Sequence, residues 1–156
     1  MKRIIIAALV TALCFVFAGC GSGSGFKAGE QFQLGENTYA LEKWERMTDK
    51  DTDTTEGYAV CLLQVGDSAP VIITGLGTDN MSTESTLDMT LNMNDSTISP
   101  NTIGFQAIDD VEGYGSRVTF SFDIPKGEDL PESATFINLT EDDESVQLNL
   151  KGLDVL

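Results

Sequence analysis

Histidine is absent from this chain of 156 residues, and basic residues are scarce: nine Lys and Arg face 25 Asp and Glu, for a formal net charge of −16. The absence of histidine excludes Ser–His–Asp and Cys–His catalysis and zinc sites built on imidazole. The scarcity of Lys and Arg disfavours binding to nucleic acid or to anionic lipid head groups, because proteins bind both through positive side chains. We therefore expect no nucleic-acid partner. The excess of acidic residues is typical of a soluble, well-hydrated domain, and it also favours binding of a cationic partner or of divalent cations.

Motifs of other enzyme classes are also missing. The chain contains no Gly-x-Ser-x-Gly nucleophile elbow and no Gly-Lys-Ser phosphate loop. The GSGSG stretch at 21–25 has the composition of a linker, and no strand precedes it as a dinucleotide fingerprint requires. One Trp and three Tyr are few for stacking against a sugar beside paired carboxylates. We expect no enzyme activity and no organic cofactor.

The longest apolar run lies at the N-terminus. Lys2 and Arg3 precede an uncharged apolar run over residues 4–19. This run is shorter than the roughly 20 residues that a membrane-spanning helix needs. A positive start, a short apolar segment and small residues at its end are typical of a secretory signal. We expect residues 1–19 to be a signal peptide that is removed.

The residues FAGC, from Phe17 to Cys20, resemble the lipobox of bacterial lipoproteins. The resemblance implies cleavage before Cys20, a diacylglycerol on the sulfur of Cys20 with palmitate-type chains, and a location on the outer face of the cell membrane. Phe17 stands where that family usually has Leu or a similar aliphatic residue. The chain then divides into a signal peptide (1–19), a lipidated cysteine with a Gly/Ser tether (20–26) and a folded domain (27–156). The alternative is an ordinary signal peptide that is cleaved elsewhere or kept.

Cysteine is scarce as well, with three in the chain. Cys14 leaves with the signal peptide and Cys20 carries lipid, so Cys61 remains alone and no internal disulfide is expected. Cys61 lies in the apolar stretch GYAVCLLQV, with no basic residue near it in the sequence. We therefore expect a buried small hydrophobic side chain rather than a reactive thiol.

The rest of the chain has the pattern of short strands. Apolar residues alternate with polar ones over 87–93 and over 118–124, which is typical of strands with one wet face. Residues 57–66 are more continuously apolar, as in a buried central strand, and the polar tracts 78–84 and 109–116 predict loops. The pattern predicts an all-β sandwich or barrel of eight or nine short strands, at 30–35, 37–45, 57–66, 69–77, 85–94, 101–108, 117–124, 134–139 and 145–150.

Two stretches resemble the Ig-like domains of Gram-positive lipoproteins. FKAGEQFQLGENTYALEKWE, at 26–45, is similar to the opening of those domains, and RVTFSFDIPKGEDLPESATFINL, at 117–139, is similar to their closing hairpin. The resemblance implies an immunoglobulin-like antiparallel β-sandwich, related to the fold of a secreted mycobacterial antigen. Most members of that family have no assigned activity, so no catalytic residues follow from it.

The acidic stretch DKDTDTTEG places Asp49, Asp51 and Asp53 at alternate positions, as at the start of a calcium loop. Thr54 stands where that loop needs glycine, and Val60 where it needs a bidentate glutamate, so we predict a solvated hairpin loop. The stretches AIDDVEGYG (107–115) and TEDDES (140–145) are interpreted as charged turns.

Together these features predict a membrane-anchored, non-catalytic binding module of the cell envelope. Its expected partner is an envelope protein, a glycan or a cationic peptide. The first alternative is a calcium-dependent ligand-binding or adhesion domain that uses the acidic loops. The second is an enzyme accessory.

Overall fold

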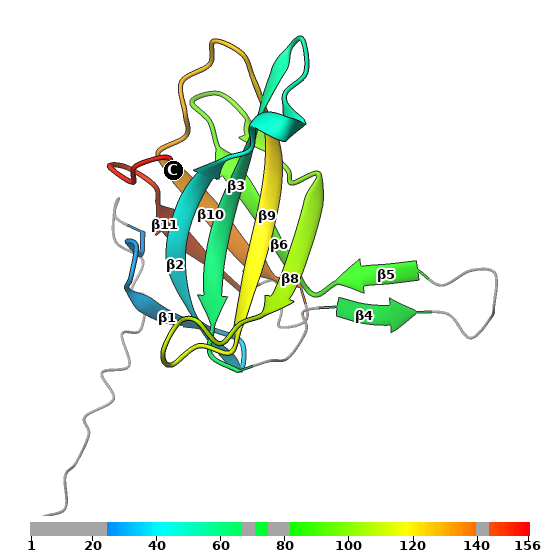
Figure 1. Cartoon of the computed structure of the whole chain (residues 1–156), viewed down its shortest axis with the longest axis vertical. Coiled ribbons are helices and arrows are strands. Elements are labelled where there is room, and N and C mark those ends of the chain that lie inside the picture. The colour runs from blue at the N-terminus through cyan, green and yellow to red at the C-terminus, as the bar shows by residue number, and fades with distance from the viewer. Residues whose placement is uncertain (1–24, 67–70, 75–81, 140–143) are drawn as a thin grey trace, which may run out of the picture.

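The structure is a computed structural model and describes residues 25–66, 71–74, 82–139 and 144–156. Two antiparallel sheets pack face to face (Figure 1), which confirms the predicted all-β sandwich. One turn of 3-10 helix, η1 (Thr48–Lys50), interrupts the strands. Within the described ranges there is no helix long and apolar enough to cross a membrane.

The strands form one large sheet, a smaller facing sheet and a separate ribbon. The five-stranded sheet has the order β1-β2-β3-β9-β8, with β1 (Gln31–Leu34), β2 (Asn37–Arg46), β3 (Thr55–Gln64), β9 (Ser116–Pro125) and β8 (Thr102–Ala107). The four-stranded sheet has the order β11-β10-β6-β7, with β11 (Glu144–Asn149), β10 (Ser133–Asn138), β6 (Leu87–Asn92) and β7 (Thr97–Ile98). The strands β4 (Val71–Thr74) and β5 (Ser82–Ser85) pair with each other and with neither sheet.

Alternation along the strands builds the core between the sheets. In β6 every second residue is buried, and β9 likewise turns four apolar side chains inward. β3 is buried on both of its faces from Gly57 to Gln64, as its continuous apolar sequence predicted. The buried core residues all lie between Phe32 and Leu150, so the segment 25–156 contains the whole described core.

Aromatic rings join the two sheets at the centre of the core. The ring of Phe136 on β10 lies edge-on to Tyr39 of β2 at 5.0 Å and to Phe120 of β9 at 5.8 Å between ring centroids. Such edge-to-face pairs contribute about 0.5–1.5 kcal/mol each beyond the burial of area. Burial also raises the pKa of the Tyr39 phenol to about 12. These contacts fix how the smaller sheet sits on the larger one.

Two strands were not predicted. Residues 82–84 were expected in a loop, but they form β5, whose polar sequence STES gives no alternating signal and whose pairing depends on β4. β7 has two residues and is too short to leave a pattern. The predicted strand 69–77 is observed as Val71–Thr74, and the predicted loop 109–116 ends at residue 115 because Ser116 begins β9.

Both ends of the described chain cover sheet edges on the same side of the sandwich. Phe26, placed in the tether by the sequence analysis, bridges to Leu148 of β11 and stacks on Phe32 at 4.8 Å. A Cβ on Gly25 would lie 2.4 Å from the carbonyl oxygen of Gln147, so only glycine fits at this point. At the C-terminal end, Val155 forms a parallel bridge with Trp44 on β2.

Candidate functional site

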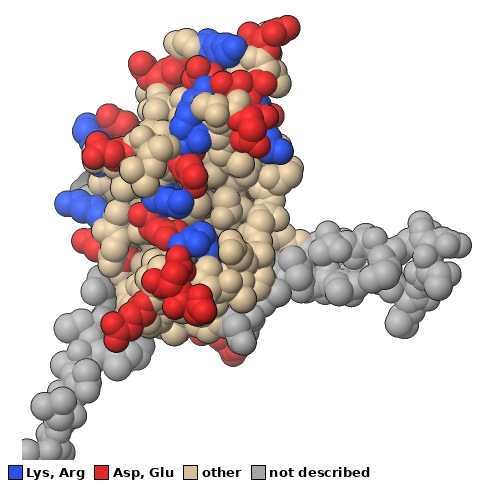
Figure 2. All heavy atoms as spheres, viewed as in Figure 1, with Lys and Arg blue, Asp and Glu red and all other residues tan. Residues whose placement is uncertain are grey.

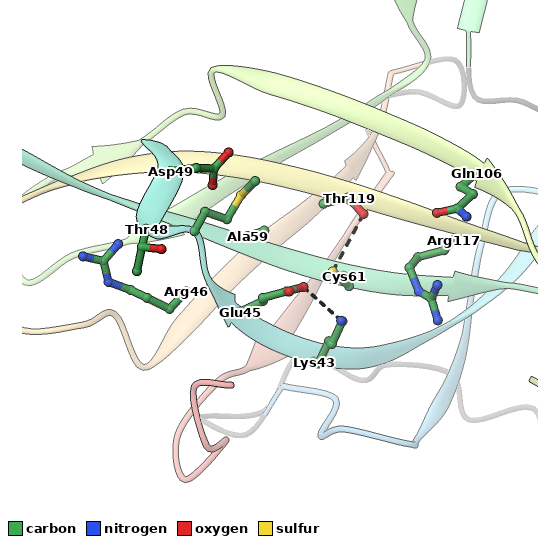
Figure 3. Close-up of a pocket in the computed structure, with 11 residues that line it drawn as sticks. Lys43, Glu45, Arg46, Thr48, Asp49, Ala59, Cys61, Gln106, Arg117 and Thr119 are labelled. Atoms are coloured by element: carbon green, nitrogen blue, oxygen red, sulfur yellow. Dashed lines mark hydrogen bonds and ion pairs between the residues drawn. The ribbon is translucent and has the colours of Figure 1, made fainter. Parts of the chain in front are cut away.

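The outer face of the five-stranded sheet carries a hollow with a volume of about 330 Å³ (Figure 3). Side chains of β2, β3, β8 and β9 and of the loop with η1 contribute to it. Its lining comprises Lys43, Glu45, Arg46, Met47, Thr48, Asp49, Ala59, Cys61, Gln106, Arg117 and Thr119.

Small residues on β3 make the floor of the hollow. Tyr58 and Val60 point into the core, so Ala59 and Cys61 between them point to the outer face. Both side chains are short, and the longer side chains of Lys43 on β2 and Arg117 on β9 stand on either side (Figure 3). The hollow therefore follows from small residues on the central strand flanked by long charged ones.

Cys61 lies at the floor and is only 2% exposed. Its sulfur is 3.7 Å from the hydroxyl of Thr119, and burial raises the pKa of the thiol. The thiol is therefore protonated and shielded at neutral pH, and a protonated thiol is a weak nucleophile. The predicted burial of Cys61 is confirmed. The structure also brings Lys43 opposite Cys61 in the ladder, a neighbour that the local sequence did not reveal.

A two-point ion pair spans the sheet beside the hollow. The Nε and Nη2 atoms of Arg117 each lie 2.6 Å from an oxygen of Glu42, and the two side chains are 18% and 19% exposed. Glu42 sits at a register shift in β2 between Leu41 and Lys43. The pair bridges β2 and β9 across β3, and its hydrogen bonds raise the pKa of the Arg117 guanidinium. Asp110 adds a longer contact to Arg117, at 3.8 Å.

A second ion pair folds the loop with η1 back onto the strands. The two terminal guanidinium nitrogens of Arg46 donate to the carboxylate of Asp51, Nη2 at 2.7 Å, and the Gly57 N–H donates to the same carboxylate at 3.1 Å. These contacts lower the pKa of Asp51 to about 2, and the hydrogen bonds from Arg46 have the largest effect. The guanidinium of Arg46 also lies 4.9 Å from the ring centre of Tyr58.

Every basic side chain of the hollow is thus matched by a carboxylate. Lys43 pairs with Glu45 at 2.9 Å, and Arg46 and Arg117 are paired as described. Figure 2 shows Lys and Arg interleaved with Asp and Glu over much of this face. The arrangement offers a polar, charge-balanced surface with a protonated thiol beneath it.

The acidic residues proposed for calcium do not form a common site. Asp51 is bonded to Arg46, while Asp49 and Asp53 are exposed. In the part of the chain that the structure describes, no group of three or more Asp, Glu, His or Cys side chains is arranged to hold a metal ion.

Two of the three acidic loops lie far apart. The 47–54 loop and the 108–115 loop lie at opposite ends of β3, whose ten residues span about 33 Å. At the end with the 108–115 loop, Glu144 accepts the N–H of Gly35 at 2.8 Å. Residues 140–143 of the TEDDES turn lie outside the described residues, as do Cys20 and the expected signal peptide.

The side chains beside the hollow that the sequence did not point to are the ion-paired ones. Glu42 and Arg117 are separated by 75 positions, and neither stands in a motif. The sequence holds only a weak indication of the pair: each residue is a charged residue within a predicted strand, next to a small or apolar neighbour. No protein family, curated protein or solved structure matches this chain.

Proposed function

We propose that the chain is a lipid-anchored binding module with an immunoglobulin-like fold, held on the outer face of a bacterial membrane. The observation that carries the proposal is the N-terminal order of features: Lys2 and Arg3, an apolar run, then Ala18, Gly19 and Cys20, then a Gly/Ser stretch. Two acyl chains on one cysteine would suffice for stable anchoring, because each buried methylene contributes about 0.8 kcal/mol.

The strand order supports the immunoglobulin-like part of the proposal. In that fold, strands A, B, E and D form one sheet and C, F and G the other. Here β2, β3, β9 and β8 follow the order A-B-E-D, and β6, β10 and β11 follow the order C-F-G. The chain also changes sheets after β3, β7 and β9, at the places that this assignment requires. On this assignment the β4–β5 ribbon is an insertion between strands B and C.

The position of Gly25 limits how far the folded domain could lie from the membrane. Gly25 and Phe26 are packed against β11, so at most five residues would separate a lipid on Cys20 from the folded body. Five extended residues reach at most about 18 Å. The edge made by β1 and β11 would therefore stay near the bilayer, and the opposite edge, made by β8 and β7, would point away from it.

A binding role agrees with the chemistry of the described surface. The hollow pairs each cation with an anion and holds its thiol protonated, so it is suited to polar contacts. The partner classes that fit an envelope protein of this charge are another protein, a glycan or a cationic peptide.

Metabolic labelling with an alkyne fatty acid in a bacterial host tests the anchor. We expect label on the wild-type protein in the membrane fraction and none on Cys20→Ala. The matched controls are Cys14→Ala and Cys61→Ala, both of which should keep the label, because Cys14 is removed and Cys61 is buried. Label that persists in Cys20→Ala, or an unlabelled wild-type protein, would overturn the proposal.

A further inference from the structure

Strand β8 is an open edge of the five-stranded sheet. Among the described strands it pairs only with β9. The N–H of Ile108 donates to the carbonyl of Gly115 at 3.0 Å, in the same register as the ladder. Bonded and non-bonded residues alternate in an antiparallel pair, so the backbone groups of Ile103, Phe105 and Ala107 point away from β9. They present a row of donors and acceptors at the edge.

Within the residues that the structure describes, this edge lacks the usual protection against strand pairing. Proteins guard exposed edges with charged residues, proline, bulges, very short strands or a covering segment. β8 has the sequence TIGFQA, with no charge and no proline, and its register with β9 runs unbroken from Thr102 to Ala107. Figure 2 shows an uncharged surface on the side of the body where β8 lies in Figure 1.

The other edges are short or partly covered. β7 has two residues, and β11 is bridged by Phe26. On the far side of the five-stranded sheet, β1 has four residues and the segment ending at Leu156 runs beside β2 near Trp44. β8 is therefore the longest unprotected edge in the described part of the chain.

The side chains of β8 suit an added strand. Ile103 and Phe105 are partly buried and pack against the core, so an adjoining strand with apolar residues at alternate positions would extend that core. Thr102, Gly104 and Gln106 are exposed on the other face, and Gly104 adds no side chain there. One face of the incoming strand is thus expected to be apolar and the other polar.

Carboxylates flank the edge at both of its ends. Asp109 and Asp110 come after β8, beyond Ile108; both are exposed, and Asp110 also lies 3.8 Å from Arg117. At the other end Asp123 is exposed on β9, two residues beyond Ser121, the partner of Thr102. A segment with Lys or Arg on either side of its strand would complement these charges, whereas a second copy of this acidic chain would be repelled.

We propose that the β8 edge binds an extended segment of a partner protein, flanked by basic residues, by adding it as a further strand to the five-stranded sheet. Backbone hydrogen bonds supply affinity in this mode, and alternate side chains supply selectivity. The proposal rests on the proposed function as a binding module and names its site and partner chemistry. It also agrees with the proposed anchor, because the chain enters the folded body beside β11, on the side of the sandwich opposite β8.

The test uses residues 25–156, which contain the whole described core, and a nine-residue peptide with Lys at both ends and alternating Val and Thr between them. Amide hydrogen exchange is followed by NMR with and without the peptide. We expect the amides of Ile103, Phe105 and Ala107 to exchange at least tenfold more slowly when the peptide is bound. Ala107→Pro removes one outward N–H and should weaken binding, while Ala107→Ser keeps it and should bind as the wild type does.

Two control peptides test strand addition and the preference for basic flanking residues separately. The same peptide with N-methyl groups at alternate residues should lose binding, and one with Glu ends should bind at least tenfold more weakly. No added protection at the three amides, or equal binding of the N-methylated peptide, overturns strand addition. Equal binding of the Glu-ended peptide, or a dimer of 25–156 in sedimentation, overturns the basic partner. Lipid labelling of Cys20 is independent of all these outcomes, so the two proposals can fail separately.

Discussion

Phe136 offers the sharpest test of the sandwich, because its ring stands where the two sheets meet. It is fully buried on β10 and lies edge-on to rings of three strands of the opposite sheet, at 5.0 Å from Tyr39, 5.8 Å from Phe120 and 6.1 Å from Phe32. Truncating a buried Phe to Ala costs about 3–5 kcal/mol through lost transfer energy and the remaining cavity. The three ring pairs place Phe136 near the upper end of that range.

We therefore expect Phe136→Ala to lower the free energy of unfolding of residues 25–156 by about 4–5 kcal/mol, a large share of the roughly 5–15 kcal/mol typical of a domain. Phe136→Leu keeps most of the volume and should cost about half as much or less. Urea denaturation followed by tryptophan fluorescence measures both, since Trp44 is buried in the same core. A loss below about 1.5 kcal/mol for the alanine variant would refute the placement of this ring between the sheets.

Two further predictions concern the ion pairs around the hollow. A double-mutant cycle with Arg117→Met and Glu42→Gln should give a coupling of about 1–2 kcal/mol, between the values for exposed and buried pairs, and a coupling below about 0.3 kcal/mol would contradict the two-point geometry. Contacts with Arg46 and Gly57 lower the pKa of Asp51 from 3.8 to about 2, so its carboxylate stabilises the fold above pH 3.8 and this contribution disappears as the pH falls through about 2. The stability difference between wild type and Asp51→Asn, measured by urea denaturation across that range, should shrink accordingly, and a pH-independent difference would count against it.

The strands that the sequence predicted best are those with one wet face. β6 and β9 alternate buried and less buried residues along nearly their whole length, and a period of two is visible without knowing the neighbours. β5 carries only Ser, Thr and Glu, so nothing in its own composition separates it from a loop. It is a strand because β4 lies beside it, which is a property of the pair.

The hollow was harder to predict than the strands. Burial of Cys61 followed from its apolar stretch, and the structure confirms it. The ion pair between Glu42 and Arg117 depends on β2 and β9 lying on either side of β3. No local pattern encodes that order of strands, because it is decided by which of many possible pairings buries the most apolar surface.

The sequence by itself determined the all-β class and the inward and outward faces of the alternating strands. It also predicts lipid attachment at Cys20 and, with it, a location at a membrane. These depend on composition and on a two-residue period, which are local properties of the chain. Only the tertiary structure decided which strands are neighbours, where charges from distant positions pair, and which edge remains open at β8. Those features arise because distant segments compete for the same partners, and the outcome depends on the packing of the whole core rather than on any one stretch.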